Sequence, residues 1–170
     1  MISWFINRQI TKAERDLGVP LDYARWIAKV SLPATMRMAK FTKLLHTHRG
    51  PTTAVHVASL VGSMAEDCGS CVQIGVNLAR QAGVSPAILQ AVVRRTPEAL
   101  PEQLADVYHF ADAVTAGSPE QDDYRERVRQ HYGDEGLVEI ALAVALHRVF
   151  PTLKRGLGFA KSCSLVPVEV

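Results

Sequence analysis

Two cysteines separated by two residues, Cys68 and Cys71, open a segment with strong helical character. Side chains three positions apart share one face of a helix, so these two sulfurs lie close enough to form a small disulfide. The partial positive charge at a helix N-terminus also favours the thiolate, which is the reactive form of cysteine. The pair therefore predicts a redox site.

A Cys-x-x-Cys pair has two other interpretations that the sequence leaves open. The pair could form half of a zinc site if two further ligands came from elsewhere in the chain. The third cysteine, Cys163, is distant in sequence, and His46-Thr47-His48 lacks the usual ligand spacing. It is also compatible with two small side chains that fill a core. We favour redox chemistry and expect Cys163 to be a buried small residue or part of the tail.

Thiol chemistry requires groups that move protons, and three residues near the pair are candidates. Glu66 either opposes thiolate formation by like-charge repulsion or accepts the proton of Cys71 as a base. Asp67 is more simply the N-cap of the helix. His56 lies on the preceding helical segment and approaches the sulfurs if the chain folds back just before Cys68. We expect the other histidines to be structural or on the surface.

The elements that must position these residues are all predicted to be helices. Apolar residues recur at three- and four-residue steps, as in Leu104, Val107 and Ala111, and no strand-like alternation persists. Glycines and prolines mark the breaks between segments, and Ser85 before Pro86 predicts a capped helix start. The expected helices span residues 2–16, 21–31, 34–46, 53–66, 68–82, 86–94, 101–116, 120–131 and 135–161. The fold class is therefore all-α, as a single-domain helical bundle.

The composition is that of an ordinary soluble globular protein, with 170 residues and a net charge of +2. It does not resemble disordered or nucleic-acid-coating proteins, so no nucleic-acid partner is expected. No run approaches the roughly 18 uninterrupted apolar residues of a membrane span, the nearest being 137–150. The N-terminus lacks the apolar region of a secretory signal, and three cysteines do not form a secreted disulfide framework. We expect a cytoplasmic protein.

Charge is segregated along the chain. No carboxylate occurs between Asp22 and Glu66, where several lysines and arginines lie. In residues 98–135, by contrast, most of the charged side chains are carboxylates. We interpret these regions as solvated faces, or as surfaces that meet within or between subunits. A membrane surface is the less favoured partner, because aromatic residues such as Trp4 and Phe5 are usually buried in the protein core.

From His56 to about Val93 the chain resembles the carboxymuconolactone decarboxylase-like family, in particular its alkyl hydroperoxidase D-like branch. A thiol pair opens a helix that ends in Ala-Gly, and another short helix follows. The residues that carry the resemblance are 66–73, 77–79 and 82–85, together with Ile88 and Leu89. The resemblance predicts a helical domain at 51–163, with residues 1–50 as an added N-terminal helical extension and 164–170 as a tail.

The resemblance implies an alkyl hydroperoxidase or disulfide reductase, assembled as a homo-oligomer (a trimer or hexamer, with a dimer as an alternative). In this branch the second cysteine, here Cys71, attacks the hydroperoxide, and the first, here Cys68, closes the disulfide. A thiol redox protein then reduces the pair. No cofactor is expected, because the chain has no glycine-rich nucleotide fingerprint. The helix dipole alone favours the first cysteine as the more acidic, so the order of the two stays open.

The chain departs from the branch at two positions. The branch has a histidine one helical turn after the second cysteine and a glutamate in the preceding helix, where this chain has Gly75 and His56. We expect Glu66 and His56 to supply the proton relay instead. The alternative is a non-catalytic oligomeric scaffold or binding protein of the same fold that has lost the relay. A metal-binding module and a peripheral membrane protein are further alternatives.

Overall fold

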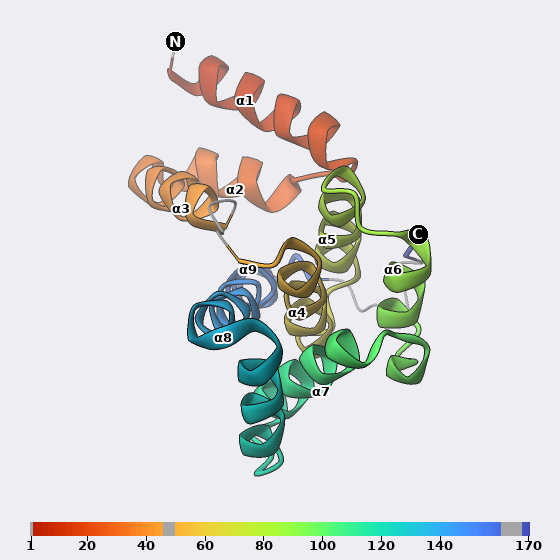
Figure 1. Cartoon of the computed structure of the whole chain (residues 1–170). Helices are drawn as coiled ribbons and strands as arrows, with labels where there is room; N and C mark the ends of the chain where they lie inside the picture. Colours follow the sequence, from red (N-terminus) through yellow and green to blue (C-terminus); the bar gives the residue numbers. More distant parts are fainter. Residues whose placement is uncertain (1, 46–49, 161–167) are drawn as a thin grey trace.

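The computed structural model describes residues 2–45, 50–160 and 168–170, and within these ranges it contains helices and no strand (Figure 1). The predicted all-α fold is confirmed. The helices are α1 (Ile2–Leu17), α2 (Asp22–Val30), α3 (Leu32–Leu45), α4 (Thr52–Ala65), α5 (Gly69–Gln81), α6 (Pro86–Val93), α7 (Glu102–Ala116), α8 (Gln121–Leu146) and α9 (Val149–Gly156), with a 3-10 turn η1 (Pro97–Ala99).

Local sequence signals account for several helix ends. Ser85 caps α6 as predicted, because its side chain accepts a hydrogen bond from the Ile88 backbone N–H. Gly117 ends α7 in the left-handed conformation, with φ 67°. The break expected at Gly133 is a kink within α8, where φ is 70° and ψ is 179°. The single helix expected over 135–161 is instead divided, because α8 ends at Leu146 and α9 begins at Val149.

Helix α4 lies at the centre of the larger hydrophobic cluster, which also contains residues from α5, α6, α7 and α8. Its side chains are buried on almost every face of the helix. Gly62 lets α8 approach closely, since a Cβ atom there would lie 2.7 Å from the backbone carbonyl oxygen of Val144. The start of α5, which carries the two cysteines, thus directly follows the central helix of the larger cluster.

Helices α1, α2 and α3 form a second hydrophobic cluster, which covers parts of α5 and α9 (Figure 1). Its buried members are Ile10, Val19, Leu21, Tyr23, Ala24 and Ile27, and Ile74 of α5 and Phe150 of α9 pack against them. The expected N-terminal extension thus lies over the helix that carries the cysteines. The division into domains near residue 50 remains a prediction.

The expectation that Trp4 and Phe5 are buried in the core is wrong. These side chains are 66% and 57% exposed, because α1 packs on the second cluster through Ile6, Ile10, Ala13 and Leu17. Other large apolar side chains are exposed on the same three helices, namely Trp26, Val30, Leu32, Met36 and Leu44. The N-terminal helices therefore present an apolar surface that the described part of the chain does not cover.

One stretch, Gln121–Gly156, is long and apolar enough to cross a membrane when judged by length and composition. The count of uninterrupted apolar residues in the sequence did not reveal it. Core helices of soluble proteins pass the same test, and this stretch is kinked at Gly133 and interrupted after Leu146. It is weak evidence for a membrane span.

Candidate redox site

Cys68 and Cys71 are joined by a disulfide at the start of α5, with their Cα atoms 5.3 Å apart. Cys68 occupies the N-cap position, and its carbonyl oxygen accepts hydrogen bonds from the backbone N–H groups of Cys71 and Val72. The predicted N-cap role of Asp67 is wrong. Asp67 adopts a left-handed conformation (φ 48°) in the tight turn after α4, which moves the cap position to Cys68.

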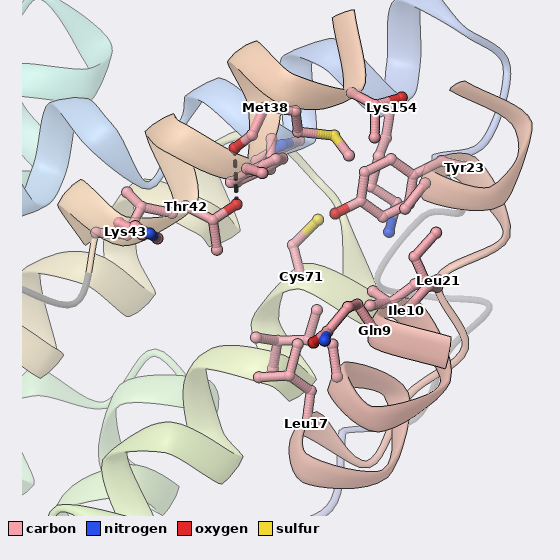
Figure 2. Close-up of a pocket in the computed structure, with 18 of the residues that line it drawn as sticks. Gln9, Ile10, Leu17, Leu21, Tyr23, Met38, Thr42, Lys43, Cys71 and Lys154 are labelled. Carbon is pink, nitrogen blue, oxygen red and sulfur yellow. Dashed lines mark hydrogen bonds between the residues drawn. The ribbon is translucent and has the colours of Figure 1, made fainter. Parts of the chain in front are cut away.

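A cavity of about 880 Å³ lies between the N-terminal helices and the helices that carry the disulfide (Figure 2). One wall comes from α1, α2 and α3, and the other comes mainly from α5 and α9. Cys71 lines this cavity and is 8% exposed, whereas Cys68 is completely buried. The second sulfur is therefore the one that a molecule in the cavity would meet first.

Lys154 of α9 is a site residue that the sequence pattern did not single out. It lines the cavity with Cys71, is only 4% exposed, and its Nζ lies 5.3 Å from the centroid of the Tyr23 ring. No described carboxylate is within ion-pair distance of it. Burial lowers the pKa of Lys154, and the charge of Asp22 acts in the opposite direction. The sequence held one sign of this role: Lys154 lies one helical turn after Phe150 and Pro151, which places it on the same inner face of α9.

A short polar chain connects this lysine to the buried sulfur. The Lys154 Nζ donates a hydrogen bond to the Ser70 Oγ, which lies 3.8 Å from the Cys68 Sγ. Hydrogen bonds that involve a charged group are the stronger ones, so the ammonium orients the serine hydroxyl. Lys154 is thus related to both cysteines: it lines the same cavity as Cys71, and the Ser70 hydroxyl lies between it and the Cys68 sulfur.

Tyr23 of α2 places a hydroxyl group in the same cavity, directed toward the Cys71 sulfur in Figure 2. The residue is 8% exposed, and its hydroxyl has no hydrogen-bond partner among the described residues. Burial raises the pKa of Tyr23 to about 12, so the hydroxyl keeps its proton at neutral pH. A buried donor without a partner is uncommon, and this one is positioned to meet a ligand.

Glu66, the C-cap of α4, is held by α9 and does not line the cavity. Its carboxylate accepts hydrogen bonds from Arg148 Nε at 2.8 Å and Arg155 Nη1 at 2.9 Å, and from the Thr152 hydroxyl at 3.3 Å. Burial alone would raise the pKa of Glu66, but the hydrogen bonds and charges of the two arginines outweigh it and leave the pKa below its ordinary value. In this geometry Glu66 positions α9, and its predicted role as a base remains a prediction.

The structure does not bring His56 to the disulfide. It is half-buried in the first half of α4, about 14 Å along the helix axis from the end that precedes the cysteines. It is not among the described residues that line the cavity. The proposed relay through His56 remains a prediction, and Lys154 is better placed. His147, expected to be structural, lines the cavity and contacts the carbonyl oxygen of Ala143 through Nδ1, 3.0 Å away.

Within the described ranges, no group of three or more histidine, cysteine, aspartate or glutamate side chains could hold a metal ion. His46, His48 and Cys163, which the zinc alternative would have used, lie outside the described residues.

Comparison with known proteins supports the fold resemblance. The chain matches no known protein-family profile and no curated protein. It is similar to a crystal structure of a protein of unknown function from Agrobacterium tumefaciens, named there as a candidate antioxidant defence protein AhpD. The TM-score is 0.67 with 26% identity, over 84% of this chain and 96% of that one. The chain is AhpD-like in fold. The broader carboxymuconolactone decarboxylase-like designation gains no support.

Gly75 occupies the position at which the resemblance predicts a histidine, and it lies close to Leu60 of α4. A Cβ atom at position 75 would lie 2.8 Å from Leu60 Cδ2, which is closer than real contacts allow. The glycine therefore admits the neighbouring helix α4 and also lines the cavity. A histidine there would require the Leu60 side chain to move.

Proposed function

We propose that this protein is a thiol oxidoreductase in which Cys68 and Cys71 cycle between disulfide and dithiol. The observation that carries the proposal is the position of Cys71, which shares a cavity wall with a buried lysine that has no described ion-pair partner. A buried unpaired ammonium destabilises the fold unless something compensates its charge. The thiolate of the reduced enzyme would be that counter-charge.

A purely structural role explains the disulfide less well. The loop that it closes contains only Gly69 and Ser70, so cross-linking removes little conformational entropy from the unfolded chain. The bond lies beside a cavity, where a reacting molecule can reach it. These features support redox cycling in preference to a staple.

In the proposed cycle the Cys71 thiolate attacks an oxygen of a hydroperoxide. The S–O bond forms as the O–O bond breaks, and the departing alkoxide takes a proton from Lys154 to become an alcohol. The Cys68 thiol then attacks the sulfenic acid, forming the S–S bond and releasing water. A dithiol donor restores both thiols and is itself oxidised to a disulfide. Forming the S–S bond within one helical turn replaces a bimolecular collision with a local one.

The test uses single cysteine variants treated with a hydroperoxide. We expect the native protein to form the Cys68–Cys71 disulfide, Cys68→Ser to stop at a sulfenic acid on Cys71, and Cys71→Ser to form neither product. Thiol counting and mass spectrometry with a sulfenic-acid trap read these outcomes. If a sulfenic acid forms on Cys68 in the Cys71→Ser protein, the order of the two cysteines is reversed.

The alternative is a non-catalytic scaffold of the same fold. It predicts that both native thiols stay reduced with excess hydroperoxide and with an oxidised dithiol partner. Reaction with the dithiol partner alone would identify a disulfide reductase, for which the same Lys154 and Ser70 groups would stabilise the departing thiolate.

A further inference from the structure

The cavity above Cys71 is larger and more apolar than access to a small peroxide requires. Its volume of about 880 Å³ lies near the upper end of the roughly 300–1,000 Å³ typical of ligand sites. The walls are mainly aliphatic side chains and methionine, which adapts to flexible chains. Examples are Ile6, Ile10, Leu17, Leu21, Met38 and Ile74.

The two sides of the cavity carry different polar groups, with Cys71 between them in the view of Figure 2. Tyr23 and Lys154 lie on one side, and both are buried. Lys43 of α3 lies on the other side and is exposed, and it has no ion-pair partner among the described residues. No carboxylate occurs in the sequence between Asp22 and Glu66, so Lys43 lies in a stretch without local counter-charges.

We infer that this cavity binds an anionic amphiphile with a single hydrocarbon chain. Lys43 binds the carboxylate at the mouth, and the chain lies along the aliphatic walls. A carbon within the chain passes Cys71, with the Tyr23 hydroxyl as a hydrogen-bond donor to an oxygen attached there. If the proposed redox function holds, the substrate is a long-chain fatty acid hydroperoxide. The cysteine pair reduces it to the hydroxy fatty acid and is itself oxidised to the disulfide, as in the cycle described above.

Binding is tested with saturated fatty acids, which cannot react, on the full-length oxidised protein below their micelle concentration. By calorimetry we expect the affinity to rise about fourfold for each added methylene group and to level off once the chain fills the cavity. The methyl ester of the same acid should bind at least several-fold more weakly, because it has no charge to pair with Lys43. Absence of any dependence on chain length overturns the inference.

Matched variants locate the two ends of the ligand. Lys43→Gln should weaken the acid to the affinity of its ester and leave the ester unchanged. Lys40→Gln, an exposed lysine of α3 outside the cavity lining, should change neither. Met38→Trp should fill the cavity and abolish binding of both, with helical content by circular dichroism unchanged. Equal effects of the two lysine substitutions would show only general attraction and would overturn the assigned head-group site.

The outcomes separate this inference from the proposed redox function. If small hydroperoxides oxidise the cysteine pair but fatty acids do not bind, the redox function stands and the substrate class is wrong. If fatty acids bind as described but no hydroperoxide oxidises the pair, the binding site stands and the redox function is wrong.

Discussion

A buried lysine beside a disulfide is the residue whose chemistry most needs explanation in this protein. The Lys154 ammonium is desolvated, and its described contacts are the Ser70 hydroxyl and the face of the Tyr23 ring. Neither contact carries a full negative charge. An arrangement of this kind is typical of functional sites, where a charge is retained despite its effect on stability.

Replacing Lys154 by Met should separate the effect of Lys154 on thiol reactivity from its effect on stability. We expect the reaction of Cys71 with hydroperoxide to slow by roughly 100-fold, because the cation that favours the thiolate and supplies a proton is lost. We also expect the free energy of unfolding in urea to stay the same or rise, because a buried unpaired charge is removed. Lys154→Arg, which keeps the charge, is the control for reactivity. Lower stability with unchanged thiol reactivity would mean that Lys154 is structural.

At the scale of elements, Glu66 connects the end of α4 to α9. The connection spans more than eighty residues of sequence, from Glu66 to Arg148 and Arg155. It fixes α9 at the point from which Lys154 reaches the cavity. An effect of Glu66 on the cysteines would then act through the placement of α9.

Glu66→Gln should lower the free energy of unfolding by about 1–3 kcal/mol at neutral pH, a discounted value because both arginines are about half exposed. The folded pKa of Glu66 lies below its ordinary value of 4.5, so its stabilisation is complete above that pH and is lost as pH falls through the folded pKa. The difference between native and variant should therefore shrink in acid. Glu126→Gln, which alters an exposed carboxylate paired with Arg129, should show no comparable loss. A pH-independent difference would contradict this assignment.

At two glycines, Gly62 of α4 and Gly75 of α5, α4 lies close to a neighbouring helix. At Gly62 a new Cβ would meet a backbone carbonyl oxygen, whereas at Gly75 it would meet the end of the Leu60 side chain. Backbone cannot move without shifting α8, but a leucine can change its rotamer.

We therefore expect Gly62→Ala to lower the free energy of unfolding by about 2–3 kcal/mol and Gly75→Ala by about 1 kcal/mol or less. The helix propensity of alanine offsets part of each change. Urea denaturation measures both, and Leu60→Val should relieve the cost of Gly75→Ala in the double variant. If both substitutions lowered the free energy of unfolding equally, and Leu60→Val did not restore it in the double variant, these close contacts would not be the reason for the two glycines.

At the scale of the whole molecule, the N-terminal helices leave a large apolar surface exposed, including Trp4, Phe5, Met36 and Leu44. Patches of this kind usually mark sites where another molecule binds. We propose that a second copy of the chain covers this surface in a homo-oligomer.

Sedimentation or light scattering should show a mass above that of one chain, and the substitution Trp4→Glu, which lies outside the cavity lining, should lower it. Leu142→Glu alters an exposed apolar residue on α8 and serves as the control. A native monomer would contradict the oligomer, and an effect of the control alone would place the interface on α8.

The sequence by itself determined the features that depend on neighbouring residues. Helical periodicity, the cap at Ser85, the left-handed glycine after α7 and the position of the thiol pair at a helix start are local properties, because they depend on backbone conformations a few residues apart. They sufficed to predict the all-α fold and a cysteine pair close enough to form a disulfide.

Only the tertiary structure decided which groups surround the cysteines. Lys154 meets Ser70 across 84 residues of sequence, and the ionisation of Glu66 depends on arginines from α9. His56, which lies near the cysteines in sequence, is far from them along α4. The physical reason is that burial and electrostatic partners depend on how helices pack, and that packing joins segments whose local patterns contain no information about each other.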